Sequence, residues 1–336
     1  MTGHIGTSVL DAMRRGASRA NSEHLPSRTL AVLPTQDAVD ALAGADADGT
    51  YALAIVASAT QPAPTPIRMA VLSVEFGAIY VLDEGGAARE VRVTVLRCNS
   101  TAEEIRELFG SFCESVLAAL PSTPTEGDVA AELERWLGLF WRLQAPPRSD
   151  VVGLIGELAF LQAAPRPGPW IQGWHGDPTS TIDFVATNPQ VEVEVKATQS
   201  PGRRHTISGD QAFGAGHRYF GSVQVDLRDS GGTIGDFARE IADRLAPEDV
   251  QGFWYLVASE CGSAYADMMS ERFVWQTSRE SLRFFRRDEI PRPEITHPLP
   301  MGVSGLRFTS DFTNSPSISA EAFFEINGQS VVTSAP

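Results

Sequence analysis

Three residues near the middle of the chain have the types needed to bind a divalent metal and activate water. Glu194 and Lys196 lie within residues 191–197, where valines alternate with charged side chains. Alternate residues of a β-strand point to one face, so this carboxylate and this ammonium project together. Asp183 lies in the preceding strand-like segment, residues 181–187, and a neighbouring strand could bring it beside them. Two carboxylates and a lysine at a sheet edge can support hydrolysis.

A nearly all-apolar helix is predicted over residues 151–162, and Glu157 is the only charge inside it. Helices that are apolar all round are buried, and an unpaired buried carboxylate is costly. We therefore expect a cation, a metal ion or the lysine to pair with Glu157; a structural ion pair or a solvent gap is the alternative. Gly153 and Gly156 would let this helix approach a sheet closely.

Strand alternation alone does not separate Glu192 from Glu194, because both project from the same face. The order of the acids along the chain favours one choice. Glu157 and Asp183 precede a triplet formed by residues 194–196 at the end of the strand. We therefore take this triplet as the active one and interpret Glu192 as a solvated residue.

Composition and charge limit the class of protein. The 336 residues suffice for one large domain or two ordinary ones, and 43% hydrophobic content is typical of a globular protein. The net charge of −15 disfavours a nucleic-acid binder, because such proteins usually have a basic face, although a local basic cleft is compatible with it. Cys98, Cys113 and Cys261 are far apart, which favours free thiols over a disulfide framework or a zinc site. No secretory signal or membrane span is evident, so we expect a cytoplasmic protein.

Three regions are predicted along the chain. Residues 1–28 are polar and irregular and are expected to form a loose N-terminal arm. Residues 29–147 are expected to form a mostly antiparallel β domain with helices, and a proline pair marks its end. Its predicted strands lie at 51–56, 67–74, 78–82 and 90–96, and its predicted helices at 37–42, 101–120 and 129–143.

Residues 148–330 alternate predicted helices and strands. This order indicates an α/β (α+β) domain, in which a mixed sheet is flanked by helices. Beyond residue 263 the pattern is less clear. The predicted helices lie at 151–162, 209–217 and 234–245, and the predicted strands at 181–187, 191–197, 204–208, 222–227 and 253–258.

The motifs GLIGELAFL, IDF, VEVEVKAT and HTISGDQ, with a Trp-rich loop after the first, carry a family resemblance. Over about residues 151–211 the chain resembles the PD-(D/E)xK restriction-endonuclease-like nucleases. More narrowly, it is similar to bacterial defence-associated proteins called "putative PD-(D/E)xK family member". Their core runs helix, three strands, helix, strand, which implies a restriction-endonuclease-like fold here. Ile182 stands where the proline of the name would be, whereas Glu194 and Lys196 match the second motif.

The resemblance implies a role in phosphodiester hydrolysis for each residue of the set. Asp183 and Glu194 would bind Mg²⁺, with Mn²⁺ as a possible substitute, and the Val195 carbonyl would add a third ligand. Lys196 would orient or help deprotonate the attacking water and steady the phosphate charge. Glu157 would assist a second metal or fix the ligands of the first.

Polar and basic residues follow the triplet closely. Gln211 would orient the lysine or contact the phosphate, and a plain helix-surface amide is equally consistent. Arg203, Arg204, His205 and Arg218 supply local positive charge that could contact DNA phosphates, or they are solvated loop charges. The histidine has no partner at metal-ligand spacing, so we do not predict that it binds the metal.

The sequence therefore predicts a Mg²⁺-dependent endodeoxyribonuclease of the type II restriction-like class, acting in restriction–modification or phage defence. Its expected partners are double-stranded DNA, a second copy of the chain, and a methyltransferase or other defence-operon proteins; the homodimer is expected by analogy. The alternative is a catalytically inactive DNA-binding or assembly subunit of a defence complex. The acidic net charge favours this alternative, and the intact acid–acid–lysine set opposes it. A structural α/β protein with a chance motif is the third reading.

Overall fold

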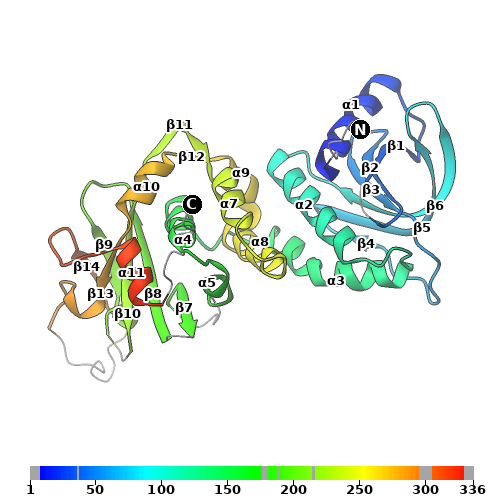
Figure 1. Ribbon diagram of the computed structural model, residues 1–336. Helices are drawn as coiled ribbons and strands as arrows, with labels where there is room; N and C mark the ends of the chain where they lie inside the picture. Colours follow the sequence, from blue (N-terminus) through cyan, green and yellow to red (C-terminus); the bar gives the residue numbers. More distant parts are fainter. Residues whose placement is uncertain are drawn as a thin grey trace, which may run out of the picture. The chain divides into compact units, whose positions relative to one another are not determined.

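The chain forms a mixed α/β structure of sheets flanked by helices, as the sequence predicted. The computed structural model describes residues 8–35, 38–175, 181–187, 190–213, 216–294 and 305–328. Within these residues no helix is both long and apolar enough to cross a membrane. Two compact units make up the chain: Met1–Pro146 with Gly262–Ala266, and Pro147–Cys261 with Asp267–Pro336 (Figure 1).

The first unit is built on a small β-barrel. Its strands follow the order β1-β2-β3-β6-β5-β4 with antiparallel neighbours, and a parallel pairing of β1 with β5 closes the sheet. Apolar side chains such as Leu30, Leu82 and Val95 fill the interior. The strands are β1 (Thr29–Pro34), β2 (Ala41–Asp46), β3 (Tyr51–Ile55), β4 (Ile67–Arg68), β5 (Leu72–Asp83) and β6 (Ala88–Cys98).

A helix replaces most of the expected loose arm. α1 (Val9–Glu23) begins at Ser8, whose hydroxyl accepts a hydrogen bond from the Asp11 backbone N–H. Val9, Ala12, Met13 and Ala20 are buried, and this spacing places them on one face of the helix. The expectation of an irregular arm was therefore wrong over these residues, because short apolar side chains among polar ones conceal an amphipathic stripe.

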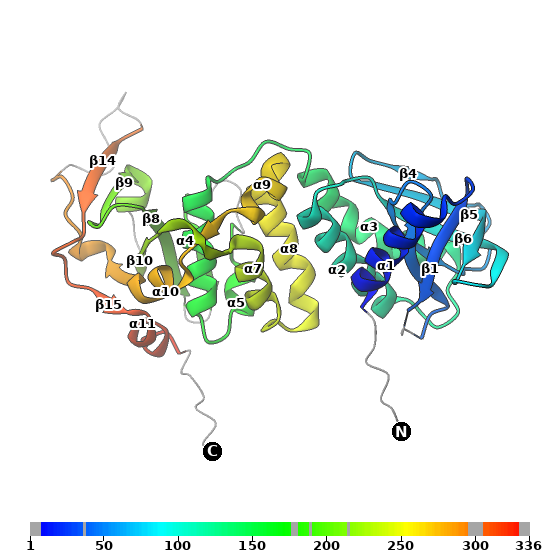
Figure 2. The ribbon, with the colours of Figure 1, turned by 90° about the horizontal axis from the view of Figure 1, so that it is seen from above.

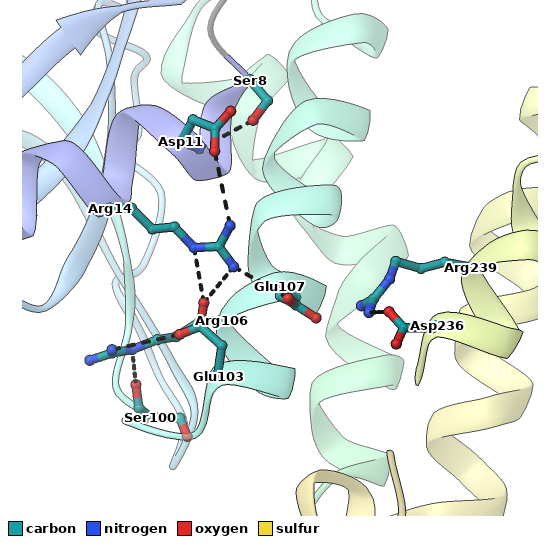
Figure 3. A network of polar contacts seen from close by, with 9 residues as sticks. All are labelled: Ser8, Asp11, Arg14, Ser100, Glu103, Arg106, Glu107, Asp236 and Arg239. Atoms are coloured by element: carbon teal, nitrogen blue, oxygen red, sulfur yellow. Dashed lines mark hydrogen bonds and ion pairs between the residues drawn. The ribbon is translucent and has the colours of Figure 1, made fainter. Parts of the chain in front are cut away.

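Figure 3 shows a polar network that joins α1 to α2 (Glu103–Ala119). Arg14 of α1 lies 2.6 Å from a carboxylate oxygen of Glu103 and 3.3 Å from one of Glu107. The Arg14 side chain is 42% exposed, and exposed ion pairs contribute little to stability. The network therefore orients the two helices, while buried apolar side chains provide most of the stability. The same figure shows a separate ion pair, Arg239 with Asp236, inside α7 of the second unit.

One other expectation for the first unit was wrong. The predicted helix at residues 37–42 is absent from the described part of that range, where β2 begins at Ala41; residue 37 lies outside the described residues. α2 begins without a side-chain cap, because Ala102 is its N-cap residue. The helix predicted at 129–143 is confirmed as α3 (Glu126–Arg142), which starts three residues earlier at a capping box of Thr125 and Asp128.

The second unit holds a five-stranded mixed sheet in the order β15-β13-β10-β8-β7. β7 is antiparallel to β8, β8 is parallel to β10, and the remaining pairs are antiparallel. Strand β9 lies outside this sheet and pairs with β14, and β11 pairs with β12. The strands are β7 (Phe184–Thr187), β8 (Gln190–Thr198), β9 (Arg204–Ser208), β10 (Arg218–Gln224), β11 (Leu227–Thr233), β12 (Arg272–Phe273), β13 (Arg283–Arg286), β14 (Arg307–Asp311) and β15 (Ile318–Ser319).

Helix α4 lies against the centre of this sheet and contacts β8 and β10 (Figure 2). Gly156 makes the approach possible, because a Cβ there would lie 2.8 Å from the Ala197 Cβ. A Cβ on Gly153 would meet only the Asp150 side chain, so Gly153 has no such role. The helices after Pro147 are α4 (Val151–Ala163), α5 (Gly168–Gln172), α6 (Gly209–Ala212), α7 (Ile234–Ala242), α8 (Pro247–Cys261), α9 (Tyr265–Ser270), α10 (Trp275–Ser281) and α11 (Ala320–Ile326).

The strand predicted at residues 253–258 was wrong, because α8 covers it. Phe253, Trp254, Val257, Ala258 and Cys261 are buried, and their spacing is that of one helix face rather than of a strand. Two other elements have limits that differ from the predicted ones. The helix predicted at 209–217 is the short α6 in its described part, and the strand predicted at 222–227 begins earlier, as β10. Residues 214–215 lie outside the described residues.

Candidate active site

The predicted triplet on β8 forms the centre of a buried polar cluster. Glu194 is 2% exposed, and its Oε1 lies 2.7 Å from the Lys196 Nζ. The Gln211 amide on α6 donates to the same oxygen at 2.5 Å and to the Thr181 carbonyl at 3.1 Å. A capping box between Ser208 and Gln211 holds that amide in place. Gln211 therefore contacts the acid of the triplet and is not a helix-surface amide.

Asp183 immediately precedes β7 and lies beside β8. Its Oδ2 accepts a hydrogen bond from the Val195 backbone N–H at 2.7 Å. The N–H and carbonyl of one strand residue point to the same side, so the Val195 carbonyl also faces the side of Asp183. The strand was expected to begin at residue 181, but β7 starts at Phe184, one residue after this acid.

Helix α4 brings Glu157 to the same region. The Glu157 carboxylate is 6% exposed, and its Oε2 accepts a hydrogen bond from the Trp174 indole N–H at 2.6 Å. The His175 Nε2 lies 3.1 Å from the same oxygen. The sequence predicted that this buried acid has a partner. The described contacts show the Trp174 indole and the His175 imidazole in that position, rather than the lysine.

Two backbone contacts hold the turn that carries Trp174 and His175. A Cβ on Gly173 would lie 1.9 Å from the Val185 carbonyl oxygen, so only glycine allows this approach to β7. His175 has a positive φ of 48°, and its backbone N–H donates to the Asp183 carbonyl at 2.8 Å. These contacts fix the imidazole next to Glu157.

Glu260, near the end of α8, is a further buried acid in the cluster. It is 3% exposed, and its Oε1 lies 3.7 Å from the His175 Nε2. The Ser149 hydroxyl donates to its Oε2 at 2.7 Å. Sequence analysis missed both His175 and Glu260. For Glu260, the helical spacing of the apolar residues in 253–261 could have indicated a helix that buries this acid. For His175, the sequence contains no comparable pattern.

Burial dominates the electrostatics of these acids. It raises the pKa of Asp183 well above its usual range, and the charges of Glu194 and Glu157 raise it further. Burial likewise raises the pKa of Glu194 to about 7, although the Lys196 ammonium opposes the shift. The pKa of Glu260 is raised by burial and by the nearby charge of Glu157. Several carboxylates therefore compete for little positive charge, which is the situation that a bound cation relieves.

The donor set fits a divalent metal ion. Carboxylate oxygens and a backbone carbonyl are the ligands that Mg²⁺ and Mn²⁺ accept, and such ions keep several waters. The Glu194 Oε2 is buried and has no hydrogen-bond partner among the described residues. Asp183, Glu194 and the Val195 carbonyl would hold such an ion. The atoms of Glu157, His175 and Glu260 form a second group, all within 4.8 Å of one another.

Lys196 is the only lysine in a chain with 26 arginines. The other 26 lysine or arginine positions in the sequence are all arginines. A compact ammonium differs from a guanidinium in size, hydration and proton affinity, so the two are not interchangeable at a reacting centre. The single lysine is thus a compositional signal for this position, and it was open to sequence analysis.

Three of the four basic residues expected near DNA are engaged inside the second unit. Arg203 donates to the Ser222 and Ser281 carbonyls, and Arg218 pairs with Glu192 at 2.7 Å. His205 is 4% exposed. These side chains do not fit the expected phosphate contacts, because internal partners use their donors. Arg204 has a 74% exposed side chain, paired with Asp311, and remains available to solvent.

His205 lies against the ring of Phe312, and its Nε2 lies 2.8 Å from the Ser222 hydroxyl. Burial, together with the charges of Lys196 and Arg203, lowers the pKa of His205 to about 4. The unfolded chain, with a histidine pKa of about 6.5, binds this proton first. His205 therefore does not reduce the free energy of unfolding above a pH of about 6.5. Below that pH, its titration lowers the free energy of unfolding as the pH falls towards 4.

We expect His205→Gln to reduce this acid sensitivity. Between pH 7 and pH 5, the wild type should lose about 2 kcal/mol more unfolding free energy than the variant, since the other titrating groups are shared. Urea denaturation at both pH values measures the difference. The exposed His217, changed to Gln, is the control and should behave as the wild type. Equal losses in the wild type and the His205 variant would contradict the assignment.

The second unit is thus an α/β structure whose mixed sheet carries Glu194 and Lys196, with Asp183 and the buried Glu157 beside them. A family model described as "Putative PD-(D/E)XK family member, (DUF4420)" matches residues 15–313. The chain belongs to this family, and the matched range includes elements of both compact units. No curated protein and no solved structure matches the chain.

Proposed function

We propose that the protein is a Mg²⁺-dependent endodeoxyribonuclease that hydrolyses DNA phosphodiester bonds. One observation carries the proposal. The chain's only lysine forms an ion pair with a buried glutamate whose other oxygen has no partner among the described residues, and Asp183 lies beside that glutamate's strand. Family membership supports a nuclease-like fold for this arrangement.

The residues divide the work of hydrolysis. A metal ion bound by Asp183, Glu194 and the Val195 carbonyl would supply a Lewis acid and lower the pKa of a bound water. Lys196, whose Nζ lies 2.7 Å from a Glu194 carboxylate oxygen, donates hydrogen bonds to the attacking water or to a phosphate oxygen. Gln211 fixes the Glu194 carboxylate by donating to the oxygen that also faces the lysine. The water oxygen attacks phosphorus and gives up a proton to solvent. The P–O bond opposite to it breaks, and the leaving oxygen takes a proton from solvent to become a hydroxyl.

The biological setting is a further part of this proposal. Double-stranded DNA is the proposed substrate, and a homodimer would place one active site on each strand. A role in restriction–modification or phage defence, beside a methyltransferase, agrees with the family resemblance. Arg204 is the exposed cation closest in sequence to the triplet that could contact DNA phosphates.

Incubation of purified protein with supercoiled plasmid tests the function. The expected result is nicked or linear DNA with Mg²⁺ or Mn²⁺, and intact DNA after EDTA is added. Methylated and unmethylated plasmids, run in parallel, show whether modification protects the substrate. Intact plasmid under every metal condition, with DNA binding retained, would instead support an inactive DNA-binding subunit.

A further inference from the structure

We propose that Glu157, His175 and Glu260 form a second metal site, which takes a first-row transition-metal ion such as Mn²⁺ in preference to Mg²⁺. The three residues come from α4, from the turn after α5 and from α8. The site's part in DNA cleavage rests on the proposed function, whereas metal binding itself does not. It would adjoin the carboxylates of Asp183 and Glu194.

The distances fit one shared ion. The His175 Nε2 lies 3.1 Å from the Glu157 Oε2 and 3.7 Å from the Glu260 Oε1. Ligands at about 2.1 Å from a metal stand roughly 3.0 to 3.4 Å apart in octahedral or tetrahedral geometry. One donor atom from each residue lies within 4.8 Å of the others. A small movement of the side chains would therefore bring all three atoms within bonding distance of one metal ion.

Neighbouring groups hold each ligand in position. The Trp174 indole donates to Glu157, and the Ser149 hydroxyl donates to the Oε2 of Glu260, which leaves the Oε1 towards His175. The His175 backbone is tied to the Asp183 carbonyl. Such supporting hydrogen bonds are typical of metal ligands, because they orient the donor atoms before the ion binds.

The local charge calls for a cation. Glu157 and Glu260 are both buried, and the arginine nearest to Glu260, Arg148, is 3.9 Å away with a 48% exposed side chain. Lys196 already faces Glu194, whose second oxygen is buried without a partner among the described residues. Among the described residues, His175 faces both acids, and the half-exposed Arg148 adds a distant charge for Glu260 only, so the two buried carboxylates share little positive charge.

The imidazole decides which metal is preferred. Mg²⁺ binds oxygen ligands almost exclusively, whereas first-row transition ions accept an imidazole nitrogen together with carboxylates. The oxygen-only set of Asp183, Glu194 and the Val195 carbonyl lacks this selectivity. The two positions should therefore differ in the nature of the bound ion.

Mn²⁺ binding to the full-length protein, without DNA, tests the site. Equilibrium dialysis gives the stoichiometry and affinity, and nitrogen modulation of the Mn²⁺ electron spin echo reports an imidazole ligand. We expect the nitrogen signal in the wild type, its loss in His175→Gln, and at least about tenfold weaker binding in Glu260→Gln. His217→Gln removes an exposed histidine elsewhere in the unit and should keep the wild-type signal.

Each outcome decides between two accounts. A wild-type protein with no nitrogen signal, or a signal that persists in folded His175→Gln, would overturn the site and leave His175 as an ion-pairing residue. A His175-dependent signal in a protein that cleaves no DNA would leave the metal site and overturn the nuclease. Metal-dependent DNA cleavage by a protein that lacks the nitrogen signal would support the nuclease and overturn the second metal site.

Discussion

Replacing Lys196 with methionine is expected to slow metal-dependent DNA cleavage at least about 100-fold while the protein keeps its fold. Methionine keeps much of the side-chain length but removes the ammonium that lies 2.7 Å from Glu194. The loss should fall on kcat, because the ammonium acts on the attacking water or the phosphate rather than on distant DNA. Single-turnover cleavage of a plasmid measures it, with circular dichroism to verify folding.

Two matched variants sharpen this test. Lys196→Arg keeps the positive charge but not the compact ammonium, and we expect it to stay impaired. Arg204→Met removes a charge of the same sign from an exposed position, so it should raise KM and leave kcat near the wild-type value. Full activity of folded Lys196→Met would remove the lysine from the mechanism.

Because Lys196 is the chain's single lysine, protein labelled with ¹⁵N-lysine should give one side-chain ammonium signal. The signal should move in Glu194→Gln, which removes the partner's charge. It therefore reports the ion pair directly, independently of DNA cleavage.

Phe160→Ala is expected to destabilise the second unit by about 3–5 kcal/mol. Phe160 is fully buried, and its ring centroid lies 4.4 Å from that of Phe184, 5.0 Å from Trp170 and 5.6 Å from Phe324. Removing the ring loses these contacts and leaves a cavity that the surrounding sheet and helices cannot fill. Four of the six tryptophans follow Pro147, so their fluorescence reports this unit during urea unfolding.

This aromatic contact also links two of the acids. Phe160 lies one turn after Glu157 on α4, and Phe184 follows Asp183 at the start of β7. The variant should therefore lower metal affinity as well as stability. Ile326→Ala removes a 60% exposed side chain from the same unit and should cost less than about 0.5 kcal/mol. A similar small cost for Phe160→Ala would show that the cluster does not hold the site together.

Local patterns predicted the core of the site but not its surroundings. Strand alternation placed Glu194 with Lys196, and the lone charge in an apolar helix identified Glu157. Strand alternation did not decide whether Glu192 or Glu194 belongs to the site. In the structure Glu192 pairs with Arg218, whereas Glu194 pairs with Lys196. The structure places these residues where the patterns predicted, because each pattern depends on one element's period and on the cost of burying a charge; their roles in catalysis stay predictions.

His175 and Glu260 depended on information that no single segment carries. The position of His175 follows from a turn that needs Gly173 and a backbone bond to Asp183, which are tertiary contacts. Glu260 was hidden because its segment was taken as a strand, although the spacing of its buried residues is helical. Likewise, no sequence pattern reveals that Arg203 uses its donors on buried carbonyls.

The central claim is that a metal bound by Asp183 and the β8 triplet hydrolyses DNA. The most direct test compares plasmid cleavage by the wild type, Asp183→Asn and Glu192→Gln under the same Mg²⁺ concentration. We expect Asp183→Asn to lose cleavage and Glu192→Gln to retain it, since Glu192 is an acid of the same strand that pairs with Arg218 instead. Cleavage by folded Asp183→Asn at the wild-type rate would contradict the account.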